Sequence, residues 1–138
     1  MLCDFVIYNN NRKIGKMRYT IIKDDNSLVK ENTIKELELE EMQKIVGGYI
    51  ERVTVSKKNG LAFYINEEGK FLKDGNLIAT KFWMNCLKKD GYDMKTFNDY
   101  IAGDAILIKE DRYGNQTDLT DEDNELLMVT MISMIDRG

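Results

Sequence analysis

The run IAGDAILIKED, at residues 101–111, is the clearest strand signal in this chain. Aliphatic and β-branched residues dominate it, and the turn-forming run RYGNQT follows at 112–117. Other β-rich runs bounded by turn residues predict further strands, at 2–8, 17–23, 49–55 and 61–66, with a shorter one at 71–72. A chain with this many strand signals is expected to fold around a sheet.

The segment TIKELELEEMQKIVGG, residues 33–48, predicts a helix in its later part, where the apolar residues can share one stripe. Gly47-Gly48 ends this helix, because glycine adopts the left-handed conformation after a helix end at no steric cost. Leu37 and Leu39 alternate instead, so a strand through Leu39 followed by a short helix is the competing interpretation.

Two further helices are predicted, over residues 77–87 and from Thr120 to the end of the sequence. Thr120 is the expected N-cap of the terminal helix, and acidic residues in its first turn favour the helix dipole. The apolar surface of this helix is wide, and most of it is expected to be core. The alternative is an exposed strip for dimerisation or partner binding, with the residues Leu127, Met131 and Met134.

This order of elements predicts one α+β domain over residues 1–138, with a mixed, mainly antiparallel sheet and two or three helices packed on one of its faces. The length fits a single domain, because cores usually divide only beyond roughly 250 residues. Met17 is a plausible alternative start, so residues 1–16 are predicted to be an N-terminal extension. The stretch from about 79 to 100 is irregular in its later part and is predicted to be an insertion.

The chain contains no histidine. This removes the commonest general base at neutral pH and the imidazole ligands of most zinc, copper and non-haem iron sites. The acidic residues between Asp111 and Asp123 are out of register for a calcium loop, so they are interpreted as helix-capping and solvated. No other catalytic constellation is recognisable, and we expect neither an enzyme nor a bound cofactor or metal.

Charge and cysteine usage restrict the class of partner and the compartment. The 20 basic and 24 acidic residues are interspersed, so nucleic-acid binding is not expected, and the pair Lys57-Lys58 is interpreted as solvated surface. No apolar run approaches the roughly 20 residues of a membrane span. Cys3 and Cys86 form no CxxC pair, which is typical of reduced thiols in a cytoplasmic protein, and Cys86 is expected to be buried.

Several blocks occur in a characteristic order: LELEEMQKIVGGYIERV at 37–53, LAFYINEEGKFLKDGN at 61–76, IAGDAILIKED at 101–111 and TDLTDED at 117–123. In this order and spacing they resemble a family of small uncharacterised domains found in bacteriophages, plasmids and the genomes of Firmicutes and actinobacteria. The resemblance covers about residues 17–128. It implies a compact α/β domain and a phage-associated setting, without an established activity.

The absence of a catalytic constellation and this resemblance favour a non-enzymatic binding protein of phage or mobile-element type. It would oppose host defence by sequestering a small, polar, nucleotide-like ligand or by docking on a host protein. The candidate ligand site combines a tyrosine that can stack with side chains that donate or accept hydrogen bonds: Tyr49, Asn66, Glu67, Asn76 and Thr80. The alternative function is a structural or regulatory interaction module that forms a homo-oligomer.

Overall fold

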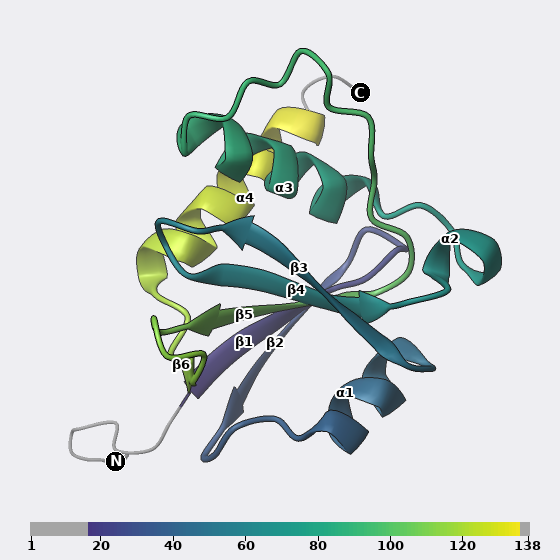
Figure 1. Cartoon of the computed structure of the whole chain (residues 1–138), viewed down its shortest axis with the longest axis vertical. Coiled ribbons are helices and arrows are strands. Elements are labelled where there is room, and N and C mark those ends of the chain that lie inside the picture. The colour runs from purple at the N-terminus through teal and green to yellow at the C-terminus, as the bar shows by residue number, and fades with distance from the viewer. Residues whose placement is uncertain (1–16, 136–138) are drawn as a thin grey trace.

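Strand β5 (Ala105–Glu110) lies at the centre of a six-stranded sheet in the computed structural model, which describes residues 17–135 (Figure 1). The strand order is β2-β1-β5-β4-β3, and β6 pairs with the end of β5. Every pairing among the described strands is antiparallel. The other strands are β1 (Met17–Ile22), β2 (Leu28–Thr33), β3 (Ile50–Ser56), β4 (Leu61–Asn66) and β6 (Gln116–Thr117).

Helices cover both faces of the sheet. Figure 1 shows α3 (Leu77–Lys89) and α4 (Asp121–Ile135) on one face and α1 (Leu39–Val46) on the other. The single turn α2 (Gly69–Leu72) lies beyond the end of β4. The predicted α+β class and mainly antiparallel sheet are therefore confirmed, whereas the expectation that the helices share one face is wrong.

The alternation of side chains along β5 explains the two helical layers. Ala105 and Leu107 belong to the core cluster that includes residues of α3 and α4, whereas Ile106 and Ile108 belong to the cluster that includes residues of α1. None of these four side chains is more than 2% exposed. Because both faces of the central strand are apolar, the sheet needs cover on both sides.

The sequence predicted neither the two-residue strand β6, whose residues were interpreted as part of a turn, nor strand β2. The residues of β2 are LVKENT, and the three central ones, Lys30, Glu31 and Asn32, have low strand propensity and are exposed. The strand forms because all six of its residues pair with β1, from Met17–Thr33 to Ile22–Leu28. Tertiary pairing therefore overrides the local preference of this segment.

Three boundaries also differ from the expectation. Leu39 begins α1, so the competing strand through Leu39 is wrong. Phe71 and Leu72 lie in α2 and not in a strand. The regular part of the 101–111 run begins only at Ala105, because Gly103 has a φ of +80° that interrupts the strand. The strand predicted at 2–8 lies outside the described residues.

The pair Gly47-Gly48 ends α1 as expected. Gly47 has a φ of +81°, and its N–H donates to the carbonyl of Gln43. A Cβ on Gly48 would lie 2.9 Å from Nδ2 of Asn66, a side chain that donates to the Val46 carbonyl and accepts from the Glu68 N–H. This contact fastens the end of α1 to the end of β4, and it joins two sequence blocks that carry the family resemblance.

Side-chain caps fix the two long helices. Thr120 caps α4 as predicted: its Oγ1 accepts from the Asp123 N–H at 3.1 Å, and its own N–H donates to Asp123 at 2.9 Å. Asn76 caps α3 and is only 1% exposed. Its Nδ2 donates to the carbonyls of Ile22 and Gly103, and its Oδ1 accepts from the Ala79 N–H. Asn76 thus connects α3, β1 and the loop before β5.

We predict that Asn76→Ala lowers the free energy of unfolding by about 3 kcal/mol, because it removes a helix cap and leaves two buried carbonyls unpaired. Urea unfolding followed by circular dichroism measures the change. The matched control is Asn98→Ala, at an exposed asparagine in the loop after α3, which should change stability by less than about 0.5 kcal/mol. Equal effects of the two substitutions would contradict the structural role of Asn76.

Candidate functional site

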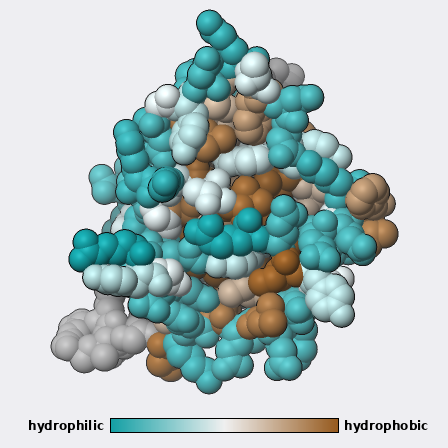
Figure 2. Space-filling model, viewed as in Figure 1, coloured by the Kyte–Doolittle hydropathy of each residue, from teal (hydrophilic) through white to brown (hydrophobic). Residues whose placement is uncertain are grey.

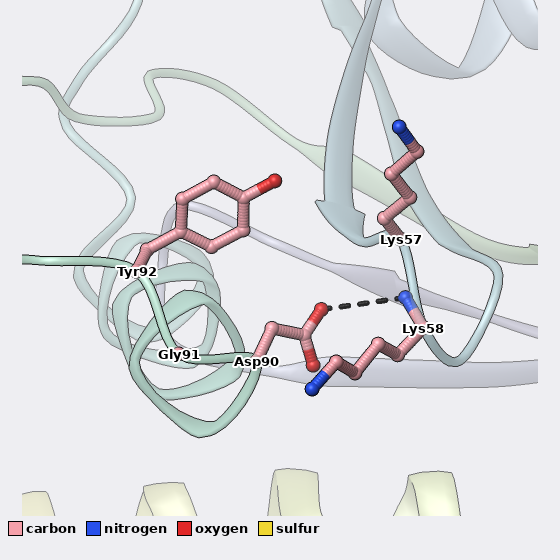
Figure 3. A pocket seen from close by; sticks show the side chains of 5 residues that line it. All are labelled: Lys57, Lys58, Asp90, Gly91 and Tyr92. Carbon is pink, nitrogen blue, oxygen red and sulfur yellow. Dashed lines mark hydrogen bonds between the residues drawn. The ribbon is translucent and has the colours of Figure 1, made fainter.

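A large depression among the described residues lies at the turn end of the β3–β4 hairpin, and we call it the hairpin hollow. Its volume is about 600 Å³. A smaller pocket of about 350 Å³ adjoins it and shares Lys57 and Tyr92 (Figure 3). The hairpin hollow is lined by Arg52, Thr54, Ser56, Lys57, Gly60, Leu61, Tyr92, Glu110, Asp111 and Arg112. Three segments far apart in sequence therefore form one depression.

The hairpin turn is held in place by the end of α3. One carboxylate oxygen of Asp90, the C-cap of α3, accepts from Oγ of Ser56 at 2.9 Å and from the Lys58 N–H at 3.4 Å. Ser56 Oγ in turn accepts from the Asn59 N–H. On the other side, Gly60 has a φ of +67°, and its carbonyl accepts from the Glu110 N–H at 2.7 Å. A Cβ on Gly60 would lie 2.2 Å from the Glu110 carbonyl oxygen, so the close approach of hairpin and β5 requires glycine.

A buried carboxylate lies beside the floor of the hairpin hollow. The Glu110 side chain is 7% exposed and accepts from Nε and Nη2 of Arg52, at 3.1 and 2.6 Å. Its other oxygen accepts a short hydrogen bond from the Tyr64 hydroxyl. Burial, and then the bond to Glu110, raise the pKa of Tyr64 to about 12. Arg52 and Tyr64 together satisfy this carboxylate, since a buried charge is costly unless it is paired.

Three exposed cations lie around the hairpin hollow and the pocket that adjoins it. Lys57 and Arg112 line the hollow, and Lys57 and Lys58 line the adjoining pocket. Lys57 and Lys58 come from the hairpin turn and Arg112 from the turn between β5 and β6. Within residues 17–135 none of the three forms an ion pair. Besides Glu110, Asp111 lines the hollow and Asp90 lines the adjoining pocket. Asp90 accepts hydrogen bonds from the hairpin, and Asp111 accepts from the backbone N–H groups of its own turn. The cations are therefore available to an anion from solution.

Aromatic rings lie next to these cations. Tyr92 follows α3 and is 52% exposed. Figure 3 shows its ring across the smaller pocket from the hairpin turn that carries Lys57 and Lys58, with Asp90 between them. Tyr113 is 75% exposed, and the Arg112 guanidinium lies over its ring at 5.1 Å. A ring beside unpaired cations suits a ligand with a flat part and an anionic part.

Other chemistry has less support in the described residues. No group of three or more acidic or cysteine side chains among residues 17–135 could hold a metal ion. The thiol of Cys86 is buried as expected, and burial raises its pKa to about 12, which keeps it protonated. Arg18 bridges Asp118 and Asp121 at the start of α4, where these carboxylates serve the packing of β1 against α4. The hairpin hollow is thus the candidate site.

The structure places the five residues predicted to bind a ligand in two groups, Tyr49 with Asn66 and Glu67, and Asn76 with Thr80. Tyr49 and Glu67 are exposed and adjacent, and the Glu67 N–H donates to the Tyr49 carbonyl at 2.9 Å. Asn66 and Asn76 are buried and bond to backbone groups, as described above. Thr80 accepts from the Ile101 N–H at 2.9 Å. Three of the five side chains thus have their polar atoms engaged within the fold, and the ligand contacts predicted for this set stay a prediction.

The residues predicted to form an exposed strip on α4 face the other way. Leu127 is 1% exposed and belongs to the core, and Met131 and Met134 pack against the same cluster while partly exposed. Leu127 is therefore a core residue of this chain. The exposed apolar side chains of α4 are instead Met128, Val129, Ile132 and Ile135.

A second exposed apolar group lies around α2. Phe71 and Leu72 are 89% and 65% exposed, and Figure 2 shows hydrophobic side chains on the edge of the molecule where Figure 1 places α2. The turn is braced by close contact of Gly69 with the Ala102 backbone and by the ion pair between Lys70 and Asp99. The sequence signal for this exposed apolar group was the pair Phe71-Leu72 after a polar turn. A short strand explained the same signal equally well.

The fold and the hairpin hollow define a small antiparallel α+β domain with a charged depression at one end of its sheet. The chain belongs to the family described as "Domain of unknown function (DUF3846)", whose model matches residues 17–132. The match begins at Met17, immediately after the predicted extension. No curated protein and no solved structure matches the chain. No helix within residues 17–135 is long and apolar enough to cross a membrane.

We predict that Tyr64 ionises about two pH units above an ordinary tyrosine, and that Glu110→Gln lowers its pKa by removing the negative acceptor. The raised pKa means that this tyrosine's contribution to stability is complete below pH 10 and is lost as the pH rises towards 12. An ultraviolet absorbance titration of ionised tyrosine measures the pKa, with Tyr64→Phe identifying the signal. An unchanged titration in Tyr64→Phe would show that no tyrosine ionises late at this position.

Proposed function

We propose that this protein is a non-enzymatic binding protein that holds a small nucleotide-like anion in the hairpin hollow. One observation carries the proposal: three cations without ion-pair partners among the described residues lie with the ring of Tyr92 around the hairpin hollow and its adjoining pocket. The depression has a volume typical of small-ligand pockets, which range from about 300 to 1,000 Å³. The surrounding chain has a net charge of −4, so this local excess of cations is not a general property of the surface.

The two parts of such a ligand would contact different sides of the hairpin hollow. Lys57, Lys58 and Arg112 would donate charge-assisted hydrogen bonds to phosphate oxygens. Tyr92 would stack on the base, since every nucleobase has a flat face that an aromatic ring can cover. Arg52 would remain paired with Glu110 when the ligand binds, because the loss of Arg52 would leave the buried Glu110 carboxylate without its ion pair.

The same groups favour binding over catalysis. A general base must be free to accept a proton from the substrate. Glu110 is occupied by Arg52 and Tyr64, and Asp90 is occupied by Ser56 and the hairpin backbone. The proposed role of both carboxylates is to position the cations and the turn.

The family resemblance suggests the setting for this activity. In a phage or mobile element, a small cytoplasmic protein that captures a nucleotide signal would blunt a host defence that depends on that signal. Docking on a host protein is the second candidate, and the braced, exposed side chains of Phe71 and Leu72 favour it. Two protruding apolar side chains fit a concave apolar surface on a protein partner better than they fit a small ligand.

Isothermal titration with ADP, adenosine and inorganic pyrophosphate tests the ligand proposal on the full chain. ADP should bind more tightly than either part, and Lys57→Glu should weaken ADP binding by at least about tenfold through loss of a charged donor. Tyr92→Ala should weaken ADP and adenosine while leaving pyrophosphate unchanged. Native mass spectrometry of gently purified protein would also reveal a bound anion of a few hundred daltons.

The matched control is Lys35→Glu, which makes the same charge change at an exposed loop residue outside the hairpin hollow. It should leave ADP affinity within about twofold of the original. If Lys35→Glu and Lys57→Glu weaken binding equally, the effect is one of net charge and the proposed site is wrong. If none of the three compounds binds and the purified protein carries no extra mass, the proposal fails and a protein partner becomes the stronger candidate.

A further inference from the structure

The later part of helix α4, after the exposed residue Glu125, is mainly apolar on the side that faces solvent. Its core side carries Asp123, Leu127 and Thr130, at spacings of four and three residues. Its outer side carries an apolar strip, which we define as Met128, Val129, Ile132 and Ile135, with exposures of 40, 58, 52 and 72%. A surface helix normally places polar residues on this side. The strip is therefore an exposed apolar patch on the later part of α4, whereas Glu122 and Glu125 are exposed on its earlier part.

From this strip we infer that α4 is the contact surface for a second copy of this chain, with the two α4 helices antiparallel across a two-fold axis near Ile132. This surface is separate from the hairpin hollow, so the inference stands apart from the proposed ligand. Isologous pairing needs a patch that is complementary to itself. An uncharged apolar strip meets this requirement, because its copy presents the same side chains.

The absence of charge along the strip favours a second copy of this chain over other partners. The sequence from Leu126 to Ile135 contains no charged residue, so a charged partner protein would find no counter-charge along the strip. The described α4 also contains no lysine or arginine, which helices that lie on anionic membranes use at their polar face. Neither the hairpin hollow nor its adjoining pocket includes a strip residue.

The acidic first turn of α4 also favours the antiparallel orientation of the two helices. The first turn of α4 carries Asp121, Glu122 and Asp123. With a rise of about 1.5 Å per residue, an antiparallel pair centred near Ile132 holds the two acidic turns about 30 Å apart. That separation exceeds the screening length of about 8 Å in physiological salt, whereas a parallel pair would place the acidic turns side by side.

The area of the strip sets the expected strength. A stable interface buries about 800 Å² on each partner, and four partly exposed aliphatic side chains supply roughly half of that. Neighbouring side chains must provide the rest, so we expect a weak dimer that forms at tens of micromolar concentration or above.

Sedimentation equilibrium of the full chain from about 5 to 500 µM tests the inference. The average mass should rise towards twice the monomer mass, and Ile132→Glu should weaken the association by at least about tenfold, because it places two carboxylates at the axis. The matched control is Ile34→Glu, at a residue that is 79% exposed and lies outside α4, and it should not change the association. A monomer across the whole range, or association that survives Ile132→Glu, overturns the inference.

Cysteine cross-linking gives a second test that does not depend on tolerance of a charge. In a Cys3→Ser background, Ile132→Cys should form a disulfide-linked dimer under mild oxidation, since residue 132 lies next to its copy at the axis. Ile135→Cys should cross-link poorly, because in an antiparallel pair centred on Ile132 it lies opposite Val129 and not opposite its own copy. Efficient linkage through Ile135→Cys, or none through Ile132→Cys, overturns the antiparallel arrangement.

Discussion

The burial of β5 on both faces is the constraint on which the rest of the molecule depends. Four consecutive side chains, Ala105 to Ile108, are excluded from solvent, and successive ones enter different cores. Truncating a buried aliphatic side chain typically costs about 2–5 kcal/mol, so either core is sensitive to a change in this strand. The same strand continues to Glu110, whose backbone contacts Gly60 and whose carboxylate holds Arg52. The position of the hairpin hollow therefore follows from the central strand.

Much of the fold was predictable where the signal is local. The runs that became β1, β3 and β4, the cap at Thr120 and the helix end at Gly47 each depend on neighbouring residues, and all were predicted. The edge strand β2 was not, because only its partner β1 makes LVKENT a strand. The side of the sheet on which α1 packs was also wrong, since helix periodicity defines an apolar face without saying which side of a sheet it meets.

The candidate site was harder to predict because its residues come together only in the folded chain. Lys57 resembled a solvated surface lysine, and Tyr92 lay in the segment interpreted as an insertion. Their proximity depends on the Ser56–Asp90 hydrogen bond between a hairpin turn and a helix end. Conversely, Asn66 and Asn76 looked like ligand-binding residues because amides are versatile in hydrogen bonding. The fold uses that versatility to pair backbone groups that helices and strands leave unsatisfied.

The composition of β2 has a consequence for how copies of this protein meet. As the last strand in the sheet order, β2 has an outer edge whose backbone groups have no strand partner among the described residues, and such an edge can recruit a strand from another molecule. Lys30, Glu31 and Asn32 are exposed along it, and charged, poorly β-forming residues make strand addition unfavourable. The low strand propensity that hid β2 in the sequence therefore protects the folded protein from sheet-to-sheet aggregation.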